Sequence, residues 1–177
     1  MSVCGIVLAA GAGTRFGGPK VLVPGWLDRA TTTLLDGGCD RVVVVLGASR
    51  TNGPVDVAPP TTPSITHVTA DDWANGLSAS LRRGLGEAAG SDALITLVDL
   101  PGLPVSVVER VLAAAGPLRQ AVFAGRPGHP VFVAEEHQAA LADTLSGDSG
   151  ARAYLAEHHA TEVECGDLWD GLDRDEG

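Results

Sequence analysis

Apolar residues recur along this chain in two spacings that alternate with each other. Short runs that are apolar at almost every position, such as 42–46 and 93–98, predict strands buried on both faces. A longer stretch at 75–89 has leucines at helical spacing and charged residues on its other faces, which predicts an amphipathic helix. The alternation of the two kinds predicts an α/β fold with a mostly parallel, doubly wound, Rossmann-like sheet.

The remaining pattern extends this alternation over most of the chain. Further strands are predicted at 3–8, 65–68, 121–123 and 131–133, and further helices at 104–115, 135–144 and 150–158. The segment 48–64 contains four prolines, so we expect an irregular surface connection there. With 177 residues, the chain is expected to form a single domain over 1–177 that includes an acidic tail at 167–177.

The overall charge narrows the classes of partner. A net charge of −10, a pI near 4.7 and the lack of a basic stripe argue against a nucleic-acid partner. A phosphate-bearing substrate would therefore need a local positive patch. No apolar run approaches the roughly 18 residues of a membrane span, and no basic leader precedes one, so we expect a cytoplasmic protein without a membrane partner.

Residues 8–20, LAAGAGTRFGGPK, follow the first predicted strand and carry the clearest chemical signal. The glycines allow a tight turn with free backbone N–H groups, and Arg15 and Lys20 add positive charge, which suits a polyphosphate. The alternative is a plain turn, which the two spaced cations disfavour. Two familiar phosphate loops do not fit, because Phe16 replaces the third glycine of a dinucleotide fingerprint and no Gly-Lys-Ser/Thr completes a Walker loop.

A carboxylate, Asp99, directly follows the predicted strand 93–98. It could cap a helix or a turn, or it could bind Mg²⁺, which proteins often hold with one or two carboxylates and the substrate phosphates. Because parallel strands end at one edge of a sheet, we expect Asp99 to lie near the loop 8–20. This expected proximity favours the magnesium interpretation.

Five ordered motifs resemble the molybdenum cofactor cytidylyltransferases, which are MobA-like NTP transferases. They are L-A-A-G-x-x-x-R-x-G-x-x-K at 8–20, W-x-x-G-x-S-x-S-L at 73–81, D-x-P at 99–101, G-H-P-V at 128–131 and G-D-x-G-A-R at 147–152. The resemblance implies a nucleotide-diphospho-sugar transferase-like fold, and transfer of CMP from CTP to the molybdopterin cofactor with release of pyrophosphate. It also implies Mg²⁺ as cofactor and a recipient molybdoenzyme as a further partner.

By the same resemblance, Arg15, Lys20 and Asp99 are candidate catalytic residues, and Asp99 and Asp173 are candidate metal ligands. The candidate substrate-binding residues are Ala9, Ala10, Gly11, Gly13, Asn75, Gly76, Ser78, His129 and Arg152. The Ala9-Ala10 pair favours cytidine by resemblance, since guanylyl relatives more often carry Ala-Gly-Gly there. Structural alternatives stay open for three residues: Asn75 as a helix cap, His129 as a residue that orients the backbone, and Arg152 as half of a surface ion pair.

Three segments depart from the family pattern. Residues 21–36 are several residues fewer than the family usually has for a loop and a full helix, and 48–64 replaces a helix expected after the second strand. Residues 173–176 match only the start of the motif D-x-D-T-P-E-D, which bears on Asp173 as second metal ligand.

Two rival functions remain. An NAD(P)-dependent oxidoreductase of the same family is disfavoured by Phe16 and by the lack of an acid after 42–46. A non-catalytic carrier of the molybdenum cofactor would suit the shortened segments, but it would not need Lys20 and Asp99.

Overall fold

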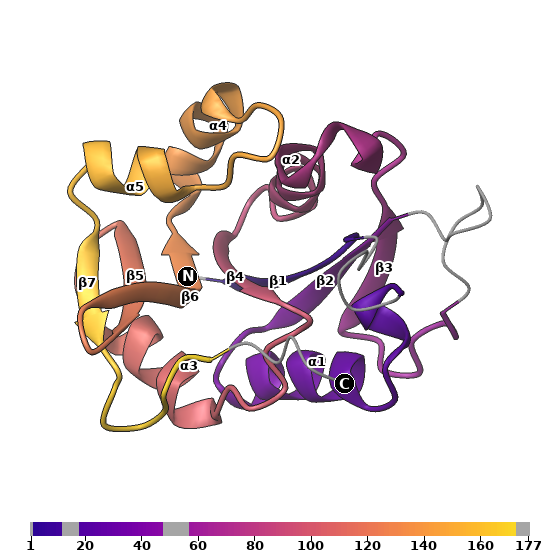
Figure 1. Ribbon diagram of the computed structural model, residues 1–177, viewed down its shortest axis with the longest axis horizontal. Helices are drawn as coiled ribbons and strands as arrows, with labels where there is room; N and C mark the ends of the chain where they lie inside the picture. Colours follow the sequence, from indigo (N-terminus) through magenta and orange to yellow (C-terminus); the bar gives the residue numbers. More distant parts are fainter. Residues whose placement is uncertain (1, 12–17, 48–56, 173–177) are drawn as a thin grey trace.

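The computed structural model describes residues 2–11, 18–47 and 57–172, and its centre is a seven-stranded sheet in the order β3-β2-β1-β4-β6-β5-β7 (Figure 1). The strands are β1 (Val3–Ala9), β2 (Arg41–Leu46), β3 (Ile65–Thr69), β4 (Asp92–Leu97), β5 (Leu118–Phe123), β6 (Arg126–Val133) and β7 (Thr161–Glu164).

Helices occupy most of the connections between these strands. The α-helices are α1 (Trp26–Asp36), α2 (Leu77–Glu87), α3 (Val105–Ala113), α4 (Glu135–Thr144) and α5 (Arg152–Glu157). Two short 3-10 helices, η1 (Lys20–Leu22) and η2 (Trp73–Asn75), precede α1 and α2. Among the residues that the structure describes, no helix is both long enough and apolar enough to cross a membrane.

The sheet has a parallel half and a mixed half. β3, β2, β1 and β4 are parallel neighbours, so all four end at the same edge. β6 runs antiparallel to both β4 and β5, and β7 pairs in parallel with β5. Because of this reversal, the first residues of β6 return to the edge where β4 ends.

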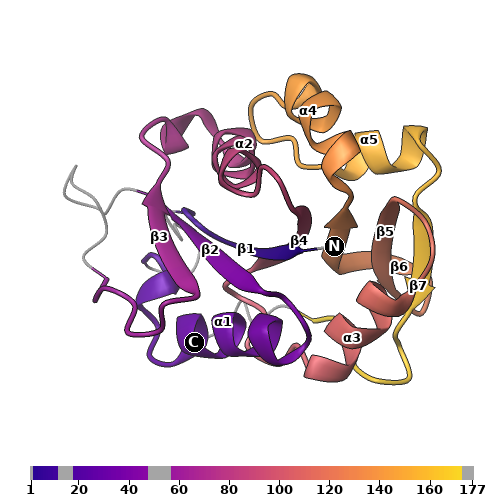
Figure 2. The same cartoon turned by 180° about the vertical axis from the view of Figure 1, so that it is seen from behind.

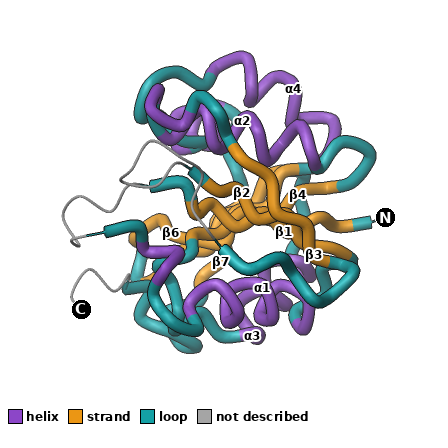
Figure 3. Tube along the Cα trace, turned by 90° about the vertical axis from the view of Figure 1, so that its right-hand side faces the viewer, coloured by secondary structure: helices purple, strands orange, loops and turns teal. Residues whose placement is uncertain are grey.

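Helices cover both faces of the sheet (Figures 1 and 2). The tube in Figure 3 shows α1 and α3 on one side of the strands and α2 and α4 on the other. Successive residues of β1 point to opposite faces, as the strand period requires. Val7 belongs to the buried cluster that includes Leu34 of α1 and Val108 of α3, whereas Ile6 belongs to the cluster that includes Leu81 of α2.

The structure confirms the predicted α/β sheet, but several of its elements differ from the prediction. β5 extends beyond the predicted 121–123, because Arg119 and Gln120 interrupt its apolar pattern. β6 extends beyond the predicted 131–133, because prolines and a glycine interrupt its pattern. β7 has only one buried residue, Val163, so no apolar run signals it. α2 begins at Leu77, since the φ of 101° at Gly76 separates it from η2.

The two internal segments that depart from the family pattern, 21–36 and 48–64, differ in whether their described residues form a helix. Residues 21–36 are long enough for a helix, because they include the 11-residue α1. Three consecutive threonines obscure this helix in the sequence, yet Thr31 fits it by donating from its hydroxyl to the Leu27 carbonyl oxygen at 3.1 Å. Residues 57–64 contain no helix, as expected, and residues 48–56 lie outside the described part.

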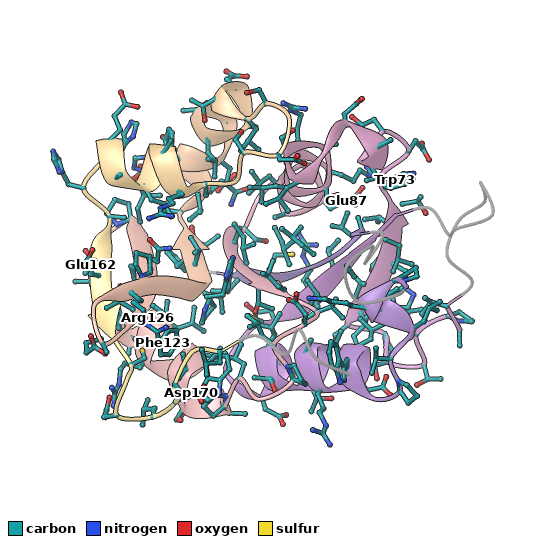
Figure 4. All side chains as sticks on the ribbon, viewed as in Figure 1. Trp73, Glu87, Phe123, Arg126, Glu162 and Asp170 are labelled. Carbon is teal, nitrogen blue, oxygen red and sulfur yellow. The ribbon has the colours of Figure 1, made fainter. Side chains whose placement is uncertain are left out.

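The first part of the acidic tail packs on the body of the protein. Asp167 forms an ion pair with Arg110 of α3. The ring of Trp169 meets Phe123 of β5 edge-on, with 5.3 Å between the ring centroids. Figure 4 shows Phe123 and Asp170 at the same end of the molecule. Residues 167–172 therefore belong to the folded domain.

Candidate active site

The ends of β1 and β4 form the floor of the candidate site. The two strands are parallel neighbours, and the Val98 N–H just after β4 donates to the Leu8 carbonyl oxygen at 3.2 Å. The chain then leaves β1 through Ala9 and Ala10, which are buried, and Gly11, which is exposed. These first residues of the glycine-rich loop therefore leave the sheet at the edge where β4 ends.

Gly47, directly after β2, leaves room for the chain to leave β1 at this edge of the sheet. A Cβ at this position would overlap the backbone of Ala10, so only glycine allows the two segments to approach this closely. Gly47 is not among the site residues predicted from the sequence. A single glycine after a run of valines is its only local signal.

Lys20 and Asp99 meet at this edge of the sheet. Lys20 begins η1 after the glycine-rich loop, and Asp99 follows β4. The Lys20 Nζ donates to Asp99 Oδ2 at 2.8 Å, across 79 positions of sequence. Their side chains are only 17% and 16% exposed, so solvent ions screen this pair less than a surface pair. The predicted proximity to Asp99 is confirmed for Lys20, the last residue of the segment 8–20.

The second oxygen of Asp99 is suited to bind a metal ion. Asp99 Oδ1 is buried and accepts no hydrogen bond from the described residues. Such an oxygen is costly to leave unsatisfied, and carboxylate oxygens are preferred ligands of Mg²⁺. Residues 2–11, 18–47 and 57–172 hold no cluster of three metal-ligating side chains. The residues present therefore fit a cation held by one carboxylate, with phosphate oxygens and water completing its coordination.

His129 reaches the same edge from β6. The residue is half-buried, and burial lowers the pKa of its imidazole from 6.5 to about 4. The negative charge of Asp99 opposes this shift, which places the two side chains within electrostatic reach. At neutral pH the imidazole is uncharged, so it offers one hydrogen-bond donor and one acceptor.

A second group of motif residues lies at the start of α2. The Ser78 N–H donates to the Gly147 carbonyl oxygen at 3.1 Å, and Ser78 is buried. A side chain at Gly76 would collide with Gly147 and Asp148. The motifs at 73–81 and 147–152 therefore form one structural unit. The interpretation of Asn75 as a helix cap is wrong, because Gly76 is the N-cap of α2 and no side chain caps it.

Of the four remaining predicted site residues, the structure describes only Arg152. Arg152 begins α5, is exposed, and forms no ion pair or hydrogen bond with the described residues. The structure therefore gives no support to the surface ion pair as its role. Gly13, Arg15 and Asp173 lie outside the described residues.

Known proteins resemble this chain in sequence and in fold. The family model of the MobA-like NTP transferase domain matches residues 5–162. Among curated proteins, the nicotine blue oxidoreductase of Paenarthrobacter nicotinovorans is 36% identical over 190 residues, covering 98% of this chain and 92% of that protein.

Solved structures show a similar fold. Rv0371c from Mycobacterium tuberculosis H37Rv matches with a TM-score of 0.79 and 24% identity over 99% of this chain and 93% of that one. The structure of its complex with manganese matches with a TM-score of 0.73 and 23% identity, covering 93% and 88% of the two chains. A nucleotidyl transferase from Methanothermobacter matches with a TM-score of 0.77 and 20% identity, covering 99% and 92%. At these identities the likeness shows the fold alone.

Proposed function

The chain belongs to the family of MobA-like NTP transferase domains, and on that premise we propose that it transfers CMP from CTP to the molybdopterin cofactor. The observation that carries the proposal is the Lys20–Asp99 pair beside the glycine-rich loop, with Asp99 Oδ1 free of hydrogen bonds from the described residues. A nucleoside triphosphate needs a cation for its phosphates, and the divalent ion that accompanies it needs a carboxylate. One edge of the sheet presents both groups.

The proposed reaction needs little covalent chemistry from the protein. A terminal phosphate oxygen of molybdopterin attacks the α-phosphorus of CTP, and the bond from that phosphorus to the bridging oxygen of pyrophosphate breaks. Positioning and charge stabilisation carry such a step. Lys20, together with Arg15 of the same loop, stabilises the negative charge that grows on the leaving pyrophosphate.

Asp99 is the proposed ligand of Mg²⁺, and Asp173 is proposed as a second ligand. The bound ion would supply a Lewis acid and a template for the phosphate oxygens. The 2.8 Å contact with Lys20 keeps the Asp99 carboxylate aligned at the end of β4, while Oδ1 remains available for coordination.

The substrate contacts follow the two groups of motif residues. The nucleotide is proposed to contact the loop at Ala9, Ala10, Gly11 and Gly13, and the start of α2 at Asn75, Gly76 and Ser78. His129 and Arg152 are proposed to border the pterin. A recipient molybdoenzyme would take the product, and we expect the whole process to be cytoplasmic.

A second candidate function is NAD(P)-dependent oxidation and reduction, which the 36% identity with nicotine blue oxidoreductase favours. Against it, Phe16 replaces the third glycine of the dinucleotide fingerprint, and no acid directly follows β2 to bind a ribose hydroxyl. A non-catalytic cofactor carrier is a third possibility, but it would have no use for a metal-binding carboxylate paired with a lysine.

A ligand panel separates these functions. Thermal unfolding is measured with CTP, GTP, ATP, NADPH or molybdopterin, each with and without Mg²⁺. A ligand at about 100 times its Kd stabilises the folded state by about 2.7 kcal/mol, so binding is readily detected. CTP with Mg²⁺ should stabilise the fold most and should release pyrophosphate when molybdopterin is added.

Other outcomes reassign the function. Equal or greater stabilisation by GTP would refute the cytidine assignment. A response to NADPH alone, with oxidation of NADPH, would favour the oxidoreductase. Binding of molybdopterin without any response to nucleotides would favour the carrier.

A further inference from the structure

The Lys20–Asp99 ion pair joins two groups that the proposed reaction uses separately. Lys20 is the cation for the triphosphate, and Asp99 is the ligand for the divalent ion. In the structure the ammonium and the carboxylate bind each other at 2.8 Å. An ammonium that donates to Asp99 Oδ2 offers less of its charge and fewer of its protons to a phosphate oxygen.

A metal ion bound at the second oxygen of Asp99 would weaken the ion pair between Asp99 and Lys20. Oδ2 holds Lys20, but the buried Oδ1 accepts no hydrogen bond from the described residues. A divalent cation at Oδ1 would neutralise the carboxylate while the lysine is still in place. The attraction between Lys20 and Asp99 would then weaken, since it depends on the charge of the carboxylate.

We propose that this ion pair couples the two ligands of the site: Asp99 withholds Lys20 from the triphosphate until a divalent cation binds Asp99. This inference rests on the proposed nucleotide transfer and specifies how binding at that site is regulated. By linkage, nucleotide and cation each strengthen the binding of the other. This contribution comes from the protein, in addition to their direct coordination to each other.

A double-mutant cycle in metal-free buffer tests the coupling. Isothermal titration calorimetry measures the Kd of CTP in excess EDTA for the wild type, Asp99→Asn, Lys20→Met and the double variant. If Asp99 withholds Lys20, the Asp99→Asn change should tighten metal-free CTP binding about fivefold, the scale of one ion pair. In the Lys20→Met background the same change should have less than about a twofold effect, because there is no ammonium to release.

The cycle distinguishes this coupling from simple repulsion between Asp99 and the phosphates. Repulsion would give the same gain in both backgrounds, and that result would overturn the inference, as would no gain in either. Glu87→Gln is a matched control, because it also removes the carboxylate of an ion pair, here with Arg83 at 2.7 Å. The Glu87 carbonyl accepts from Arg41 at the start of β2, which places Glu87 at the opposite edge of the sheet. It should leave the Kd of CTP unchanged.

A second measurement does not depend on the Asp99 variant folding. Binding of Mn²⁺ without nucleotide is followed by electron paramagnetic resonance of the free ion. Lys20→Met should bind Mn²⁺ about fivefold more tightly than the wild type, and the matched charge control Arg83→Met should not. Equal Mn²⁺ affinity in Lys20→Met and wild type would overturn the inference.

The inference and the proposed function can fail separately. If the wild type binds CTP with Mg²⁺ but the cycle shows no coupling, only the inference fails. If the wild type binds no CTP in either buffer, the proposed function fails and the inference fails with it.

Discussion

Two ion pairs among the described residues connect distant parts of this chain. They differ in how many carboxylate oxygens each pair leaves without a hydrogen bond. In the pair between α3 and the tail, Arg110 donates through both terminal nitrogens to both oxygens of Asp167, with 2.9 Å from Nη2 to Oδ2. In the pair at the sheet edge, Lys20 satisfies one oxygen of Asp99 and leaves the other without a hydrogen bond from the described residues.

The two pairs therefore have different uses. Each oxygen of Asp167 accepts a hydrogen bond from Arg110, and the Asp167 side chain is 62% exposed. Arg110 also donates to the Glu164 carbonyl oxygen at 3.0 Å. This pair tethers the tail to the body of the protein. The Asp99 carboxylate is mostly buried and half-satisfied, which is the condition of a group that can still bind a ligand. A spare buried oxygen alone does not mark a site, because Asp92 Oδ2, at the start of β4, is also buried without a hydrogen bond from the described residues. Asp99 differs because its spare oxygen lies on a carboxylate that is paired with Lys20, at the edge where the parallel strands end.

The largest expected difference between the pairs concerns turnover. Asp99→Asn keeps the shape of the side chain but removes its charge, so CTP-dependent pyrophosphate release should fall at least about 100-fold. Asp167→Asn should leave turnover unchanged. Both variants should remain folded by circular dichroism. Wild-type turnover in Asp99→Asn would remove Asp99 from the site, whereas unfolding of that variant would assign it a structural role.

Substitutions of the cation in each pair should also differ strongly in their effect on turnover. Lys20→Ala removes a charge-assisted contact with the leaving pyrophosphate and should lower turnover about 10- to 100-fold. Lys20→Arg should restore only part of it, because a planar guanidinium does not replace a compact ammonium. Arg110→Ala should have no effect on the same pyrophosphate assay. Unchanged turnover in Lys20→Ala would mean that this lysine does not bind the phosphates.

Acid should affect the stability of the two regions in different pH windows. The folded pKa of His129, about 4, lies below its ordinary 6.5, so the unfolded chain binds more protons between these values. The free energy of unfolding should therefore fall as pH drops through this window, by up to about 1.4 kcal/mol per pH unit. Denaturant unfolding at several pH values should show that His129→Gln reduces this slope. Part of the slope should remain, because burial also lowers the pKa of His67 below 6.5.

The tail pair provides the contrast for this measurement. The bond from Arg110 holds the pKa of Asp167 below its ordinary 3.8. The stabilisation from this carboxylate is present above pH 3.8 and is lost as pH falls through the lower folded value. Asp167→Asn should consequently leave the slope between pH 4 and 6.5 intact. Loss of that slope in Asp167→Asn would show that the acid sensitivity arises in the tail and not at His129.

The smallest expected effect is on the tether itself. Arg110→Met should lower the Tm slightly, because an exposed pair is screened by solvent and salt. The change should shrink further at high salt, as measured by differential scanning fluorimetry. A Tm decrease that does not depend on salt would indicate that packing of the Arg110 side chain, not its charge, holds the tail.

Local pattern in the sequence is enough to predict much of this protein. The valine run of β2 identifies a strand buried on both faces, because such a strand needs apolar side chains at every position. The glycine-rich loop and Asp99 each follow a predicted strand, and parallel strands end at one edge. Their proximity could therefore be predicted, and the 2.8 Å contact between Lys20 and Asp99 confirms it. Arg15 and Asp173 remain predictions from sequence.

Only the tertiary structure decided the remaining features. The reversal of β6 brings His129 back to the site, and the contact of Ser78 with Gly147 joins two motifs. β7 adds an edge strand with a single buried residue, Val163. Periodicity reports which face of an element is buried, but not which element covers it. Pairing, close backbone approach and an unsatisfied carboxylate oxygen arise from contacts between distant segments, so only the assembled fold reveals them.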